Sequence, residues 1–239
     1  MITTLASAGP HISITAEKMF SVFGVSITNS MLLGIIGYGL LIWAAIYVAR
    51  GIQSGSKSKF VLAGQWLFEM LYKMTMDILG DRVLARRVAP LAITIFFAVM
   101  FNNWLGTMPG VGPITYNGSP LFRGLAADLN FTFALSIVTM VAVQIYAIKQ
   151  HGAWGNAKRY LVNPFKNPVG AFEGILEFVG EFSRFVALSM RLFGNVFGGE
   201  VLLVVIGFLT SWLGFLPLPI FMGCEVFVGA LQAFVCYIL

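Results

Sequence analysis

A stretch in the last third of the sequence, SMRLFGNVFGGE at positions 189–200, carries three side chains that could do chemistry inside an apolar region. They are Arg191, Asn195 and Glu200, and the flanking runs FVALSM and VLLVVIGFL are strongly apolar. An arginine at the centre of a membrane costs about 2.5–3.5 kcal/mol on insertion scales, so such residues usually face a partner or a cavity. The stretch therefore indicates an ion pathway. The alternative is an intramembrane salt bridge that only holds helices together.

The spacing of the polar residues along a helix divides them between two faces. At about 100° per residue, Arg184 and Asn195 fall within about 40° of Arg191. Glu177 lies on the same face, whereas Glu200 lies on the opposite one. An arginine is effectively never deprotonated, but a carboxyl group can take up and release a proton. Carboxyl groups on one side of a fixed cation could therefore admit protons while the cation blocks a direct leak.

A second polar pair lies near the end of the sequence. Glu225 and Gln232 are seven positions apart and share one face of a helix. If the last two helices pack as a hairpin, we expect Glu200 and Glu225 to lie in one polar cavity. Small residues allow helices to approach closely, and the segment provides Gly194, Gly198 and Gly199. Two further carboxyl groups, Glu173 and Glu181, have no assigned role, and we expect them to be hydrated.

Several kinds of chemistry are missing from the sequence. It contains no G-x-x-x-x-G-K-[ST] motif, so we expect no catalytic nucleotide site in this chain. The two histidines, His11 and His151, lie outside the apolar stretches, which argues against a histidine metal cluster or histidine catalysis inside the membrane. We expect neither a cofactor nor a metal. An intramembrane enzyme is disfavoured because no nucleophile–base pair is evident.

The composition shows what must position these residues. The chain is 58% apolar and 10% charged, whereas soluble domains carry about 25% charged residues. Its mean hydropathy is +0.86. A helix of about 20 residues crosses a bilayer core of about 30 Å. Five stretches meet that length, at 30–49, 88–107, 129–148, 170–209 and 216–239. We predict an all-α membrane protein with five membrane-embedded helices.

The fourth stretch is too long for a simple crossing. Forty helical residues measure about 60 Å, which is twice the bilayer core. The segment must therefore be tilted, broken or partly interfacial. We predict that 170–239 forms a long tilted helical hairpin that carries the ion path.

A further helix is predicted between the first two spans, at 60–79. Its polar residues recur every fourth position and form one stripe on an otherwise apolar helix. This pattern is typical of an amphipathic helix that lies in the membrane surface. The stripe consists of Gln65, Glu69, Lys73 and Asp77.

The basic residues predict the orientation. Of the fifteen, eleven fall in the two loops that follow the first and third spans, and Lys18 and Arg123 fall on the other side. By the positive-inside rule, the amino-terminal segment 1–29 lies outside and the carboxyl terminus lies in the cytoplasm.

The positive charge is divided among short loops, which disfavours nucleic-acid binding. We expect a single membrane domain over 1–239. The absence of a signal or transit peptide favours a bacterial plasma (inner) membrane, with a mitochondrial or plastid inner membrane as the alternative.

At SMRLFGNVFGGE the sequence resembles the a subunit family of rotary ATP synthases. Four further segments agree with that family in the same order: SITNSML, FNNWLGTMPG, AADLNFTFAL and GALQAF. Together they extend from Ser26 to Phe234, so the resemblance covers nearly the whole chain. The resemblance implies a stator subunit in the membrane sector. Such a subunit conducts the protons whose flow drives ATP synthesis. The partners implied are the c-subunit ring, the peripheral-stalk b subunits, the rest of the synthase and the lipid bilayer.

The resemblance also implies roles for particular residues. Arg191 would face the ring, attract its carboxylate and separate two offset half-channels. The other matched residues are Asn195 and Gln232 beside the arginine, Glu200 and Glu225 as the polar pair of the outer half-channel, Asp128 and Asn130 at its mouth, and Glu177 and Arg184 on the cytoplasmic path.

One departure from the family pattern raises a question. Many relatives carry a histidine at one position of the Glu200/Glu225 pair, whereas both are acidic here. The sequence leaves the division of roles between these two residues open. A different class of function, a secondary transporter that binds an anionic solute at Arg191, would favour inverted repeats and broken helices in both halves. The pattern of spans argues against that class.

Overall fold

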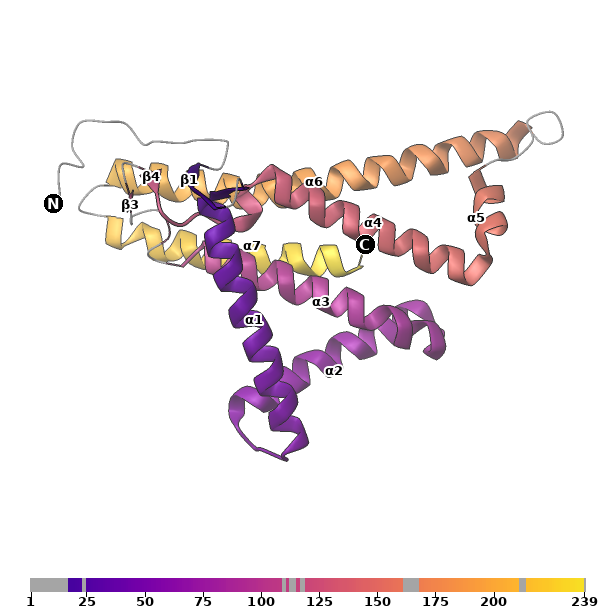
Figure 1. The fold of residues 1–239 in the computed structure, drawn as a ribbon, viewed down its shortest axis with the longest axis horizontal. Helices are drawn as coiled ribbons and strands as arrows, with labels where there is room; N and C mark the ends of the chain where they lie inside the picture. Colours follow the sequence, from indigo (N-terminus) through magenta and orange to yellow (C-terminus); the bar gives the residue numbers. More distant parts are fainter. Residues whose placement is uncertain are drawn as a thin grey trace. The chain divides into compact units, whose positions relative to one another are not determined.

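A computed structural model describes residues 17–22, 25–108, 111, 115–116, 119–160, 168–210 and 214–238, and helices dominate it (Figure 1). Its elements in chain order are β1 (Lys18–Val22), β2 (Val25–Thr28), α1 (Asn29–Gln53), α2 (Lys59–Leu79), α3 (Arg82–Gly106), β3 (Thr115–Tyr116), β4 (Ser119–Pro120), η1 (Leu125–Ala127), α4 (Leu129–His151), α5 (Ala153–Tyr160), α6 (Pro168–Thr210) and α7 (Pro217–Ile238). The strands form two antiparallel pairs, β1 with β2 and β3 with β4.

The membrane class is confirmed. Five helices are long and apolar enough to cross a membrane, namely α1, α3, α4, α6 and α7. They coincide with the five predicted spans within six residues at each end, and the largest difference is the start of α3 at Arg82. The helix α2 covers the predicted interfacial segment, and its location in the membrane surface stays a prediction.

Large apolar side chains are exposed along these helices. On α1, Trp43 is 63% exposed and Ile42 is 59% exposed, and on α6 Phe178 and Phe182 are similarly accessible. A soluble monomer rarely shows large contiguous apolar patches. In a bilayer the same side chains contact lipid chains, so their exposure is consistent with spanning helices.

Local sequence signals set the helix ends. Thr28 caps α1, because its side chain accepts a hydrogen bond from the Met31 amide at 3.3 Å. Gly80 ends α2 with a φ of 65°, a left-handed conformation that favours glycine. The next residue, Asp81, caps α3 by accepting from the Val83 amide at 2.8 Å. Two adjacent residues thus terminate one helix and start the next, which makes the corner between α2 and α3 tight.

The chain forms two compact units, and the first comprises Met1–Asp128 together with Asn195–Leu239. Within it, α3 is central and packs against α7, α2 and α1. The helix α2 is also tied to α7, because the hydroxyl groups of Thr75 and Tyr237 share a hydrogen bond of 2.6 Å. Tyr237 in addition donates to the Leu71 carbonyl at 2.6 Å.

The last span is fastened to α3 by side chains that bind its backbone. The indole of Trp104 donates to the Val226 carbonyl at 3.0 Å, and the amide of Asn103 donates to the Gly229 carbonyl at 3.4 Å. A Cβ at Gly229 would lie 3.1 Å from the Asn103 Cβ, so glycine allows this close approach. The predicted hairpin of α6 and α7 stays a prediction.

The second unit, Leu129–Gly194, contains α4, α5 and the first part of α6. Aromatic side chains connect its elements. Phe133 of α4 and Phe185 of α6 have ring centroids 5.7 Å apart. Tyr160 of α5 meets Phe178 of α6 edge-on at 6.5 Å. The short helix α5 is therefore packed onto α6 within this unit.

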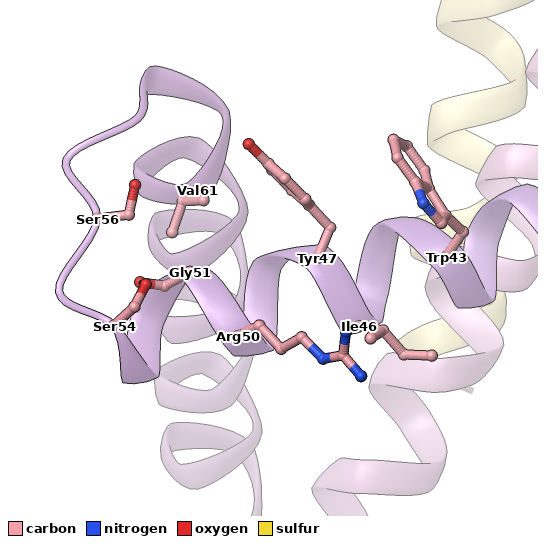
Figure 2. A pocket seen from close by; sticks show the side chains of 8 residues that line it. All are labelled: Trp43, Ile46, Tyr47, Arg50, Gly51, Ser54, Ser56 and Val61. Carbon is pink, nitrogen blue, oxygen red and sulfur yellow. The ribbon is translucent and has the colours of Figure 1, made fainter.

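A surface hollow of about 370 Å³ lies where α1 ends and α2 begins (Figure 2). Aromatic rings form part of its wall. Tyr47 stacks on Trp43 with ring centroids 5.8 Å apart, and its centroid lies 6.1 Å from that of Phe60. The lining residues are Trp43, Ile46, Tyr47, Arg50, Gly51, Ser54, Ser56 and Val61. None of these residues belongs to the polar set singled out in the sequence.

Candidate functional site

The Glu200 carboxylate forms an ion pair inside the first unit. The Arg123 Nε lies 3.3 Å from the Glu200 Oε2. The Arg123 side chain is only 2% exposed, whereas that of Glu200 is 33% exposed. The guanidinium group also lies 5.7 Å from the centroid of the Phe197 ring, which adds a cation–π contact. Glu200 is therefore matched by a permanent positive charge on a different segment.

Close backbone packing holds Arg123 in place. The next residue is Gly124, and a Cβ there would lie 3.3 Å from the Val196 Cγ1 of α6. A Cβ at Gly106, the last residue of α3, would lie 3.2 Å from the Gly124 Cα. The following turn, η1, is fully buried, and Leu125 packs against Gly34 of α1. The arginine thus enters the site on a tightly fitted segment.

Glu225 of α7 lies beside this pair. Its carboxyl group contacts Gly199, the residue before Glu200 in α6. Two carboxyl groups this close repel one another when both are ionised. The Glu225 Oε2 is buried and has no hydrogen-bond partner in the part of the chain that the structure describes. The structure therefore brings the two carboxyl groups together, with a fixed cation on one of them.

Three other predicted site residues also lie in the first unit. The Asp128 Oδ2 accepts a hydrogen bond of 3.2 Å from the hydroxyl group of Ser30, which is fully buried. Gln232 is buried on α7, and its amide nitrogen lies 3.7 Å from the Cys236 Sγ. Asn195 is half-buried on α6.

The remaining predicted residues lie in the second unit. Arg191 and Arg184 expose their side chains, and Glu177 is half-buried. All three lie on α6, which is one continuous helix from Pro168 to Thr210. The angular spacing derived from an unbroken helix therefore applies to them. Asn130 is exposed in the first turn of α4.

The second unit also contains a polar network around Glu181. The Glu181 Oε2 accepts a hydrogen bond of 2.6 Å from the Gln144 amide, and its Oε1 accepts one of 2.5 Å from the Tyr160 hydroxyl group. Asn156 in turn donates to the Gln144 Oε1 at 3.0 Å. Glu181 is thus engaged by two neutral donors rather than simply hydrated, while Glu173 is exposed.

The comparison with protein families decides the identity. The family model described as ATP synthase A chain matches residues 30–239. The chain belongs to this family. As a member of the A chain family it is a subunit of the proton-translocating membrane sector of ATP synthase.

Curated relatives support this membership over most of the chain. The ATP synthase subunit a of Mycobacterium leprae is 28% identical over 249 residues, covering 100% of this chain and 94% of that protein. The subunit a of Acidothermus cellulolyticus is 29% identical over 212 residues, covering 88% and 71%. The subunit a of Aliivibrio fischeri strain MJ11 is 31% identical over 209 residues, covering 82% and 74%.

Sequence reasoning about this A chain missed Arg123 as part of the site. The positive-inside count treated it as a loop residue of the outer surface, whereas the structure buries it against Glu200. Two signals could have revealed it. A carboxylate at membrane depth requires a compensating charge, and Arg123 is a lone basic residue next to the apolar runs PLF and GLAA.

Proposed function

We propose that this chain is the proton-conducting stator subunit of a rotary ATP synthase. It forms two offset half-channels against a ring of c subunits, and Arg191 separates them. The observation that carries the proposal is the composition of α6. This single helix has an exposed arginine at 191 and, nine residues later, a carboxylate that belongs to a half-buried ionisable cluster.

In this proposal the outer half of the proton path and the fixed arginine have separate roles. Protons enter from outside near Asp128 and Asn130 and reach the Glu200/Glu225 pair. From there they pass to a carboxylate of the ring. Arg191 attracts the ionised ring carboxylate and stops protons from crossing directly, because a guanidinium group cannot relay them.

The other polar positions of α6 and α7 complete the path. Asn195 and Gln232 are polar companions of the arginine. On the cytoplasmic side, Glu177 and Arg184 line the exit. Support for this assignment comes from their placement on one continuous helix and from the exposure of Arg184, which leaves its charge accessible.

We also propose the partners of the chain, its membrane and its topology. Its partners are the c ring, the peripheral-stalk b subunits and the remainder of the synthase. The chain acts as a single domain of a bacterial plasma (inner) membrane, with 1–29 outside, an interfacial helix at 60–79 and a tilted hairpin over 170–239. The carboxyl terminus is cytoplasmic, as the distribution of basic loops indicates.

Replacing Arg191 in the assembled complex tests the proposal. In Arg191→Ala we expect loss of ATP synthesis driven by a proton gradient, because no fixed charge separates the half-channels. The subunit should still be recovered in the purified complex, because the Arg191 side chain is exposed. Arg86→Ala, an exposed arginine on α3, is the matched control and should retain synthesis. Normal coupling in Arg191→Ala would contradict the proposal.

A further inference from the structure

We propose that the hollow between the end of α1 and the start of α2 binds an anionic glycerophospholipid. The lipid phosphate binds Arg50 and Ser56, and one acyl chain lies along the rings of Trp43 and Tyr47. The site is separate from the proposed proton path and shares no residue with it. Only the assignment to the cytoplasmic leaflet rests on the proposed orientation of the chain.

One face of α1 changes its chemical character along the helix axis. At about 100° per residue, four lining residues fall within about 60° of one another, namely Trp43, Tyr47, Arg50 and Ser54. At about 1.5 Å per residue, Arg50 lies about 10 Å beyond Trp43, and Ser54 lies about 6 Å beyond Arg50. The face thus passes from aromatic to cationic to hydroxyl-bearing. A phospholipid presents the matching order of acyl chain, phosphate and polar headgroup.

Tight packing of α1 on α2 gives the hollow a preformed wall. A Cβ at Gly51 would lie 2.5 Å from the Val61 Cγ2, and a Cβ at Gly64 would lie 3.1 Å from the Val48 Cγ1. Val61 itself is 1% exposed. The two helices are therefore held close together at this point, and the hollow of about 370 Å³ beside them does not depend on a ligand to form.

The charges around the hollow favour an anion. Arg50 is exposed, and its side chain makes no ion pair within the ranges that the structure describes. The following loop adds Lys57 and Lys59, which are both exposed. From position 18 to position 68 the sequence contains no aspartate or glutamate, so no carboxylate of these segments competes for the guanidinium group. A phosphate is attracted here, whereas the ammonium group of a zwitterionic headgroup is repelled.

Two further features suit a phosphate. The Ser54 hydroxyl group already donates to the Gly51 carbonyl at 3.1 Å. The Ser56 hydroxyl group lines the hollow and makes no hydrogen bond with any other described residue, so it is available as a donor. The helix α2 starts without a side-chain cap from Ser58. Its first turn, which includes the lining residue Val61, adds the positive end of a helix dipole.

The aromatic part of the wall is suited to an acyl chain. Trp43 is 63% exposed and Tyr47 is 46% exposed, although their rings stack on each other. Tryptophan and tyrosine are enriched where a membrane meets water. Figure 2 shows both rings on α1, with the Arg50 side chain extending along the same helix toward Ile46. An arginine beside apolar side chains at the end of a span is stabilised by an anion at that depth.

The combination of these features favours a lipid over other anionic occupants. A soluble anion or an acidic segment of another subunit would meet the same cation. A soluble anion would make no use of the exposed aromatic rings. The rings and the cation also lie at the end of α1, a candidate membrane span, so lipid chains are adjacent to the hollow.

The test uses the assembled synthase in nanodiscs that contain equal amounts of phosphatidylglycerol and phosphatidylcholine. In each sample one of the two lipids carries a photoreactive acyl chain, and mass spectrometry maps the labelled residues. Each basic residue near a membrane surface contributes about a fivefold preference for anionic lipid. We therefore expect phosphatidylglycerol to label segment 43–61 about fivefold more than phosphatidylcholine. Equal labelling by the two lipids would overturn the inference, because it would indicate contact with bulk lipid alone.

Variants of Arg50 test its role as the phosphate ligand. Arg50→Gln should reduce labelling by phosphatidylglycerol about fivefold, whereas Arg50→Lys should keep part of it. Arg86→Gln is the matched control, because it removes the same charge from an exposed position of α3 and should leave this labelling unchanged. Equal losses in Arg50→Gln and Arg86→Gln would overturn the site. Recovery of the subunit in each complex reveals failed assembly, and the comparison of the two lipids in the wild type needs no variant.

Two further outcomes would assign the hollow to another occupant. If inorganic phosphate in molar excess abolishes the labelling, the hollow binds a soluble anion. If neither lipid labels the hollow in the assembled complex, another subunit covers it. Either result would overturn the inference. Labelling decides the lipid site and coupling in Arg191→Ala decides the stator function, so each proposal can fail alone.

Discussion

Two carboxylates on α6 are held in different ways. Glu200, in the first unit, is paired with a permanent cation at 3.3 Å. Glu181, in the second unit, accepts hydrogen bonds from an amide and a phenol, both neutral. Both contacts are charge-assisted, but they respond differently to a proton. Protonating Glu200 would weaken an ion pair with a buried guanidinium group, whereas protonating Glu181 would weaken hydrogen bonds from neutral donors.

The two carboxyl groups therefore have different roles within the same helix. The Arg123–Glu200 pair joins the segment before η1 to α6 through opposite charges. The network of Glu181 with Gln144, Tyr160 and Asn156 joins α4 and α5 to α6 and fixes a geometry. The predictions that follow are designed to break each arrangement separately.

The largest effect is expected from removing the cation. Arg123→Met keeps much of the volume but removes the cation beside the Glu200 carboxylate. Breaking a fully buried pair costs about 3–5 kcal/mol, and the cost here is smaller because Glu200 is 33% exposed. We expect this variant to be released from the detergent-purified complex at a clearly lower temperature than the wild type. Arg86→Met is the control, because Arg86 is exposed on α3 and should change stability by no more than about 0.5 kcal/mol. Equal behaviour of the two variants would show that the ion pair is energetically unimportant.

A smaller effect is expected from one methyl group beside the acidic pair. In Gly199→Ala the new Cβ overlaps the Glu225 carboxyl group, so the carboxyl group or the helix must move. Overpacking of this kind costs about 1–3 kcal/mol, and the displaced carboxyl group should slow proton pumping. Gly198→Ala is a matched control, because a Cβ at that position meets nothing within 4 Å. Pumping and yield should therefore fall in the first variant and not in the second.

The smallest change in stability is expected from a substitution in the hydrogen-bond network of Glu181. Tyr160→Phe removes the hydrogen bond to Glu181 and the longer one, of 3.4 Å, from the Gln144 amide. It keeps the edge-on contact with Phe178. Interhelical hydrogen bonds in membranes average about 0.6 kcal/mol, with a maximum near about 1.7 kcal/mol. We expect a small decrease in the release temperature of the subunit and an unchanged pH profile of pumping. A shifted pH profile would mean that Glu181 handles protons. Tyr72→Phe on α2, where the ring stacks on Phe68, is the control.

The fold was largely predictable because hydropathy and helix length determine membrane spans. The five spans emerged at their observed places, and the Gly80–Asp81 corner follows from residues that end and start helices. The contact of α7 with α3 was not predictable. It depends on Trp104 and Asn103 reaching backbone carbonyls more than a hundred positions away, and no periodicity encodes such pairs.

The site was predictable in part, for a related reason. Glu200 and Glu225 stand out because each is a carboxylate in an apolar run. Arg123 does not stand out, since it lies in an irregular segment where a charge is usually solvated. Its burial results from the fit of Gly124 against Gly106 and Val196, which is a property of the folded chain.

The bond from Trp104 to the Val226 carbonyl has a consequence for measurement. Val226 directly follows Glu225, so the indole is bound to the backbone beside one acid of the Glu200/Glu225 pair. Indole emission responds to the local electric field and to hydrogen bonding. Trp104 is one of five tryptophans. In a variant whose other four are replaced by phenylalanine, the emission of this intrinsic reporter can be followed while the vesicle interior is acidified, without any added dye.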